Sequence, residues 1–180
     1  MPRSASSPQL AVHNLFFAIQ PPKDIRLRLA KATALLPVGG KPVGADRLHI
    51  STLNLVHEGA LPEGLREEAA EAVTDMEASP FPVMFDRLAG GATSIVLLPG
   101  EPLDHLRLFR ERLGLRLIRA GMDVRLERRF RPHITLLYGN ELTFETEIDP
   151  IVWTVEDFVL IDSFVGQTKH VEVGRWPLRA

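Results

Sequence analysis

The sequence contains no cysteine, which removes several classes of protein at once. Without thiols the chain can form neither a disulfide framework nor a thiolate zinc site, and it has no cysteine nucleophile. The absence also suits a reducing compartment, so the cytoplasm is the expected location. A chain of 180 residues should bury roughly 70% of the surface that it exposes when unfolded, which is enough for a core without such cross-links.

Long hydrophobic runs and an excess of charge of one sign are also missing. No apolar stretch approaches the eighteen or so residues of a membrane span, so we expect no membrane association. Residues 1–11 lack the apolar core of a signal peptide and are expected to form a flexible tail, and residues 12–180 are expected to form a single domain. A net charge of -2 argues against a protein that coats long nucleic acids, but it allows a small anionic ligand or one nucleic-acid end.

Apolar periodicity and turn residues predict the same order of elements twice. The first half has a strand at 14–19, a turn with two prolines, a helix at about 25–36, a loop and a strand at 48–56. A charged helix (63–77) and a strand (81–88) lead through a Gly90-Gly91 turn to the second half, with a strand at 93–98, a helix at 103–117 and a strand at 132–138. We therefore predict two similar lobes, whose sheets are completed by strands from 151–165 and 169–176.

The last strand of each half carries a histidine beside a hydroxyl. His49 and Ser51 stand two residues apart, as do His133 and Thr135, and side chains at this spacing share one face of a strand. If the lobes are related by an approximate twofold axis, the two pairs meet in one cleft. Two histidines across a phosphate can act as general base and general acid, and the hydroxyls can bind its non-bridging oxygens.

The alternative is that these are two unrelated, half-buried histidines, because the His-x-Ser/Thr pattern is short enough to occur by chance. Context favours a shared site. Each pair opens an apolar strand that closes one half of the repeat, and the remaining histidines lack the pattern.

Four segments of the sequence together resemble the 2H phosphoesterase superfamily. They are Leu15-Phe16-Phe17-Ala18-Ile19-Gln20-Pro21-Pro22, His49-Ile50-Ser51, Phe130-Arg131-Pro132-His133-Ile134-Thr135-Leu136 and Trp176-Pro177-Leu178. The likeness is greatest to the bacterial branch of 2′-5′ RNA ligases, or RNA 2′,3′-cyclic phosphodiesterases, and covers about residues 14–178. In the first motif Ser51 stands where Thr is commoner, and polar Thr52 where a hydrophobic residue is usual. Serine retains the hydroxyl, so the chemistry survives the change.

The resemblance implies an α+β fold of two pseudo-symmetric lobes, with antiparallel sheets around a central cleft and helices on the outside. It implies a metal-independent hydrolase without a cofactor that opens 2′,3′-cyclic phosphodiesters to 2′-phosphates, with His133 as base and His49 as acid. The expected substrate is an RNA 3′ end or a cyclic nucleotide, the expected state is a monomer, and no protein partner is implied. Whether the natural substrate is an RNA end, a tRNA fragment or a small nucleotide stays open, as does 2′-5′ ligation.

Basic and aromatic residues before the second motif are further candidates. Arg131 is predicted to bind phosphate, with Arg128 and Arg129 as weaker candidates, because guanidinium binds phosphate bidentately. Phe130 could stack on a base, and Lys41 precedes the first motif. The alternatives are a solvated basic loop and ordinary packing of the aromatic ring.

Other classes of function find little support in the sequence. There is no His-x-His or His-Glu-x-x-His zinc motif, no Walker A sequence and no Gly-x-Gly-x-x-Gly. A metal-dependent hydrolase and a nucleotide-driven ligase are therefore disfavoured. The serious alternative is a binding protein that holds a nucleotide or RNA end in the same cleft without turnover. The presence of both histidines favours catalysis, since binding alone could rely on arginines and hydroxyls.

Overall fold

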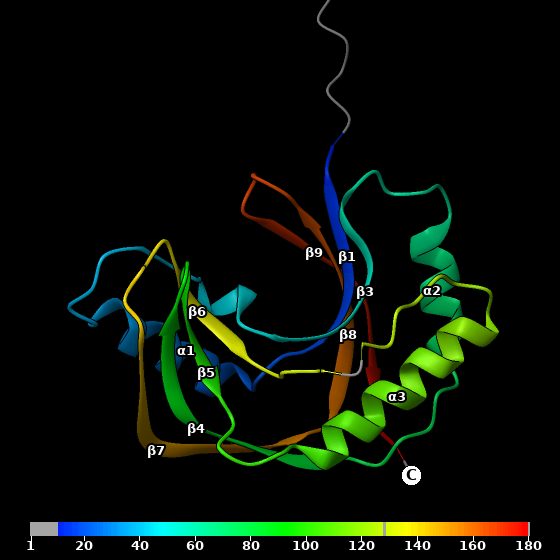
Figure 1. Ribbon diagram of the computed structural model, residues 1–180. Coiled ribbons are helices and arrows are strands. Elements are labelled where there is room, and N and C mark those ends of the chain that lie inside the picture. Colours follow the sequence, from blue (N-terminus) through cyan, green and yellow to red (C-terminus); the bar gives the residue numbers. More distant parts are fainter. Residues whose placement is uncertain (1–10, 128, 180) are drawn as a thin grey trace, which may run out of the picture.

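The structure is a computed structural model that describes residues 11–127 and 129–179 (Figure 1). The described residues form the strands β1 (His13–Ile19), β2 (Lys41–Pro42), β3 (Ile50–Gly59), β4 (Phe81–Gly91), β5 (Ser94–Leu98), β6 (Ile134–Tyr138), β7 (Phe144–Val155), β8 (Asp157–Phe164) and β9 (Lys169–Pro177). They also form the helices α1 (Lys23–Ala34), α2 (Leu65–Val73) and α3 (Asp104–Arg119) and a 3₁₀ turn, η1 (Ala45–Arg47). The predicted tail lies almost wholly outside the described residues.

The strands form two antiparallel sheets, which confirms the predicted α+β fold class. One sheet has the order β3-β1-β8-β9 and the other the order β2-β6-β5-β4-β7 (Figure 1). The long strands β4 and β7 run along the second sheet, and the chain passes from β7 directly into β8 of the first. The two halves of the sequence repeat thus supply neighbouring strand pairs, β1 with β3 and β5 with β6.

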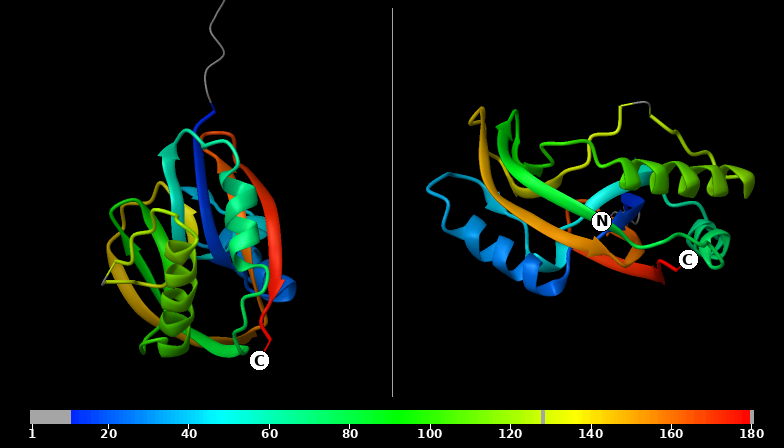
Figure 2. Two further views of the ribbon diagram at one scale, coloured as in Figure 1. Left: turned by 90° about the vertical axis from the view of Figure 1, so that its right-hand side faces the viewer. Right: turned by 90° about the horizontal axis from the view of Figure 1, so that it is seen from below.

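The helices α1 and α3 pack differently on the two sheets. The helix α1, which follows β1 in sequence, packs against β2 and β6 of the other sheet, while α3 packs against β3, β4 and α2. Figure 2 shows α1 at one end of the molecule and the pair α2 and α3 at the other. Only α1 therefore packs on the sheet of the other half, whereas α3 contacts both sheets, β3 in the first and β4 in the second.

Strand β1 is buried on both faces. Leu15, Phe17 and Ile19 belong to the main core, which extends between both sheets. On the opposite face Phe16 and Ala18 form a small second cluster with residues of β8. Successive side chains of β1 point alternately into these two apolar layers, so nearly every residue of the segment is apolar. This explains why the sequence predicts a fully buried strand here.

The structure corrects one sequence prediction about the strands. The hairpin turn between β4 and β5 falls at Ala92-Thr93, whereas Gly90 and Gly91 remain in β4. Gly90 is required there by close approach, since a Cβ would collide with the Leu142 carbonyl oxygen of the chain next to β4. The segment 151–165, predicted to supply strands that complete the two sheets, forms the end of β7 in one sheet and all of β8 in the other.

Within the described residues, none of the helices is both long and apolar enough to cross a membrane.

Candidate active site

The two His-hydroxyl motifs occupy equivalent places in the two sheets. Ser51 of β3 lies opposite Ala18 of β1, and Thr135 of β6 lies opposite Val96 of β5, so each hydroxyl sits at the second residue of its strand. Each histidine directly precedes its strand. This shared register carries both pairs into one cavity of about 260 Å³.

We call this cavity the histidine cavity. Its lining residues are Asn14, Phe16, Val43, Arg47, His49, Ser51, Asn54, His57, His133, Thr135, Tyr138, Ser163 and His170. The four predicted residues of the two motifs, His49, Ser51, His133 and Thr135, are therefore brought together, as the sequence repeat predicts.

Both motif histidines are oriented by the same local hydrogen bond. Nδ1 of His49 lies 2.6 Å from the carbonyl oxygen of Arg47, and Nδ1 of His133 lies 2.9 Å from that of Arg131. A carbonyl can only accept, so Nδ1 carries the proton in each ring and Nε2 is the nitrogen without one. In both motifs the fixed tautomer results from the backbone carbonyl two residues before the histidine.

The motif histidines differ in their surroundings. Nε2 of His49 lies 3.1 Å from Oγ of Ser51, and its ring packs against Phe16 at 5.0 Å between centroids. Burial, together with the nearby His170 and His133, lowers the pKa of His49 from 6.5 to about 4, against the opposing effect of the Arg47 carbonyl. His133 is exposed to solvent. At neutral pH the free protein therefore holds His49 uncharged, with Ser51 donating to its Nε2.

Two further residues of the histidine cavity, Arg47 and His170, were missed by the sequence reasoning. His170 comes from β9, where it pairs with Ser163 of β8, and its ring lies 5.7 Å from that of His49. No local pattern marks His170, since only sheet pairing brings it to the motif. Arg47 did have a signal, because Arg-x-His-Ile-Ser at 47–51 matches Arg-x-His-Ile-Thr at 131–135.

A larger groove of about 880 Å³ continues from the histidine cavity, with which it shares Ser51, Asn54, His57 and His133. We call it the outer groove. Its other lining residues are Thr52, Leu53, Leu55, Val96, Leu98, Arg110, Asp123, Arg125, Glu127, Arg129, Phe130 and Arg131.

The predicted accessory residues line the outer groove rather than the histidine cavity. Arg131 and Arg129 are exposed there, and Phe130 is half-buried, with the Arg110 guanidinium 4.7 Å from its ring centroid. One face of the Phe130 ring is thus already occupied. Arg128 lies outside the described residues. Lys41 is exposed on β2 and lines neither space.

Metal-ligating side chains are not clustered in the described residues. Among them there is no group of three or more His, Asp or Glu side chains positioned to hold a metal ion. The histidine cavity offers instead proton-accepting nitrogens, hydroxyls and one guanidinium.

Comparisons with known proteins agree with this geometry. The sequence profile described as the 2′-5′ RNA ligase superfamily matches residues 21–165. The chain belongs to this superfamily of 2H phosphoesterases. It is thus an enzyme, a phosphoester hydrolase. Over 173 residues it is 31% identical to the RNA 2′,3′-cyclic phosphodiesterase of Escherichia coli, and the aligned region covers 91% of this chain and 96% of that protein.

Solved structures of the superfamily have the same fold. The crystal structure of E. coli LigT in apo form matches with a TM-score of 0.74 at 25% identity and covers 94% of this chain and 99% of LigT. The complex of LigT with 3′-AMP matches with a TM-score of 0.71 at 26% identity over 94% and 99% of the two chains. The similarity therefore spans both sheets and the cleft between them.

Proposed function

We propose that this 2H phosphoesterase hydrolyses 2′,3′-cyclic phosphodiesters at RNA 3′ ends or on nucleotides and releases 2′-phosphates. The convergence of two identically oriented His-hydroxyl pairs on one cavity carries the proposal. Support also comes from the E. coli relative, which is an RNA 2′,3′-cyclic phosphodiesterase, and from LigT, whose structure includes a complex with 3′-AMP.

In the proposed mechanism His133 activates the attacking water. Its imidazole is exposed, so water reaches it, and Nε2 accepts a proton as the water oxygen bonds to phosphorus. The bond from phosphorus to the ribose 3′ oxygen breaks at the same time. That oxygen receives a proton from His49, and the product keeps its phosphate on the 2′ oxygen.

His49 must gain its proton before it can act as the acid, because its pKa is lowered to about 4 in the free protein. The negative charge of a bound cyclic phosphate favours the imidazolium and raises the pKa again. Protonated Nε2 no longer accepts from Ser51, so the Ser51 hydroxyl becomes free to donate to a non-bridging oxygen. Thr135 offers the second hydroxyl from the opposite wall.

The outer groove is the proposed path for the nucleotides that precede the cyclic phosphate. It opens from the histidine cavity and carries Arg125, Arg129 and Arg131. Three guanidiniums bind few phosphates, so their electrostatic contribution to the binding free energy is modest. They therefore match the backbone of a short single strand better than that of a long duplex. We propose that the site holds the last one to few nucleotides of an RNA.

Incubation with adenosine 2′,3′-cyclic phosphate and with a short RNA ending in a cyclic phosphate tests the function. The expected product in both cases is the 2′-phosphate, identified by phosphorus NMR or by its resistance to enzymes that remove 3′-phosphates. Turnover should persist in excess EDTA, because the proposed proton transfers need only histidines.

The control is the double variant in which both motif histidines are replaced by Ala. If this variant is inactive, the turnover by the wild type does not come from a contaminating enzyme. A protein that binds both substrates without converting either would instead be a nucleotide or RNA-end binding protein. A strict need for added divalent metal would overturn the mechanism.

A further inference from the structure

The histidine cavity has an unusual charge balance. Its lining includes Arg47 and four histidines, at positions 49, 57, 133 and 170, and among the described residues no Asp or Glu lines it. A concave site with cationic groups and no carboxylate concentrates anions. The two motif histidines and their hydroxyls account for part of this lining, but Arg47 and His170 have no role in the proposed proton transfers.

Arg47 occupies the place in the first motif that Arg131 occupies in the second. Each arginine stands two residues before its histidine and gives that histidine a carbonyl acceptor. Their side chains lie in different places, since Arg47 lines the histidine cavity and Arg131 lines the outer groove. Of the two equivalent arginines, one thus lies in the histidine cavity and the other in the outer groove.

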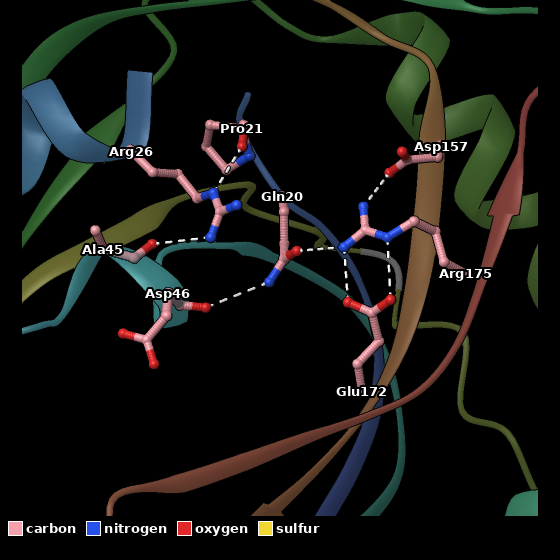
Figure 3. A network of polar contacts seen from close by, with 8 residues as sticks. All are labelled: Gln20, Pro21, Arg26, Ala45, Asp46, Asp157, Glu172 and Arg175. Atoms are coloured by element: carbon pink, nitrogen blue, oxygen red, sulfur yellow. Dashed lines mark hydrogen bonds and ion pairs between the residues drawn. The ribbon is translucent and has the colours of Figure 1, made fainter. Parts of the chain in front are cut away.

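The Arg47 guanidinium makes no hydrogen bond or ion pair within the described part of the chain, although the residue is half-buried. The backbone around it is held firmly. Arg26 donates to the carbonyls of Pro21 and Ala45, and Gln20 bridges η1 to Arg175 of β9 (Figure 3). A fixed backbone with an unpaired cation at its end is a preorganised arrangement for an anionic ligand.

His170 lies beside this cation with an unused nitrogen. Its Nδ1 is buried and has no hydrogen-bond partner among the described residues, and its ring packs edge-on against His49 and Phe16. Burial and the charge of Arg47 lower the pKa of His170, while Asp46 opposes them. The charge of Arg47 likewise contributes to the lowered pKa of His49. A bound anion would relieve this mutual repulsion.

We propose that Arg47 and His170 form an anion-binding subsite on the His49 wall of the histidine cavity and that it holds phosphate oxygens of the substrate and product. This deepens the function proposed above and rests on it for the identity of the ligand. The subsite explains how a site with a neutral His49 still attracts a phosphate. Arg47 supplies the charge at the cavity, and phosphate binding then permits His49 to become protonated.

Direct binding of inorganic phosphate and of adenosine 2′-monophosphate, measured by calorimetry, tests the subsite without any turnover. Arg47→Gln should raise both dissociation constants about tenfold to a hundredfold, since a charge-assisted hydrogen bond is lost. His170→Phe keeps a ring against Phe16 and should weaken binding about twofold to tenfold, as expected for one neutral donor. Arg28→Gln on α1 removes the same charge from an exposed helix position and should bind as the wild type does.

Circular dichroism shows whether each variant is folded. If Arg47→Gln is unfolded, Arg47→Lys decides instead, because it keeps the charge without the bidentate geometry and should bind with intermediate affinity. Wild-type affinity in a folded Arg47 variant overturns the subsite even if cyclic nucleotides are hydrolysed. Phosphate binding that depends on Arg47 supports the subsite even if cyclic nucleotides are not hydrolysed. The two proposals can therefore fail independently of each other.

Discussion

The guanidinium of Arg110 donates from Nε to the carbonyl oxygen of Thr52 at 2.8 Å, across 58 residues of sequence. Arg110 lies in α3, and Thr52 follows Ser51 in the strand of the first motif. The same side chain reaches the carbonyl of Glu127 at 3.4 Å and covers one face of Phe130. Arg110 thus ties β3 to the loop that leads into the second motif, and so fixes the two halves of the site relative to each other.

Arg110→Leu should therefore reduce both stability and turnover. We expect a loss of about 1–3 kcal/mol in the free energy of unfolding, because the Thr52 and Glu127 carbonyls lose a buried donor. Turnover should fall more than substrate affinity if the loop no longer places His133 correctly. Denaturant unfolding and steady-state kinetics measure these effects.

The matched control is Arg107→Leu in the same helix. Arg107 forms exposed ion pairs with Asp104 and Glu111, so its loss should change stability by less than about 0.5 kcal/mol and leave kinetics unchanged. Equal effects of the two variants would show that Arg110 has no special role.

Replacing either motif histidine by Ala should lower turnover about 10²–10⁴-fold, the range for a positioned acid or base. The double variant should be scarcely worse than the poorer single one, because the two residues act as a unit. Ser51→Ala and Thr135→Ala should cost less, since each removes only a neutral donor to phosphate. If Ser51→Ala were as damaging as the His variants, a covalent role of Ser51 would replace the direct attack of water. Loss of the fold in the His variants, judged by circular dichroism and melting, would mean that the histidines serve packing.

A substrate with a good leaving group distinguishes the histidine that acts as acid from the one that acts as base. On a phosphodiester that releases p-nitrophenolate, which needs little protonation, His49→Ala should recover much of the activity that it loses on the cyclic substrate. His133→Ala should stay impaired on both, because water activation is still needed. The comparison of kcat/KM for the two substrates measures this, and the reverse pattern would exchange the two roles.

The pH profile should reflect the lowered pKa of His49. Since kcat/KM reports ionisations of the free enzyme, its acidic limb should lie near pH 4 rather than near 6.5, whichever role His49 has. The full profile should be bell-shaped, with limbs that belong to a coupled pair. A rate that rises steadily from pH 5 to 10 would contradict paired-histidine catalysis.

Stability should depend on pH through the same residue. Between pH 6.5 and 4 the unfolded chain binds a proton at His49 that the folded protein does not, so the free energy of unfolding falls as the pH falls. A lowering of the pKa from 6.5 to about 4 corresponds to about 3 kcal/mol over this range. Urea unfolding of the wild type and of His49→Asn at pH 7 and 4.5 tests this, because the variant should lack that part of the decline. Identical declines would contradict the lowered pKa.

Salt should weaken RNA binding only modestly. If the outer groove contacts about two phosphates, log K against log[salt] for a short single strand should have a slope of about -1.4. Arg131→Ala should raise KM more than it lowers kcat, because that guanidinium is expected to bind ground and transition states alike. Arg28→Ala is the control of equal charge on α1. A slope several times steeper, or unchanged kinetics in Arg131→Ala, would place the phosphate-binding surface elsewhere.

The sequence by itself determined the family, the fold class and the central constellation of this protein. The two His-x-Ser/Thr motifs could be found because the hydroxyl follows the histidine at the local period of a strand, and because each motif opens a strand after a similar succession of elements. The same local logic fixes the orientation of both rings, since the carbonyl acceptor lies only two residues away.

Tertiary structure decided what stands around those motifs. His170 enters the site through the pairing of β9 with β8, and Arg110 through the packing of α3 on β3, neither of which leaves a local pattern in the sequence. The packing of α1 on the sheet of the other half was equally hidden, because an amphipathic helix shows which face it buries but not the sheet that covers it. The lowered pKa of His49 is likewise a property of burial and of neighbours that only the folded chain brings together.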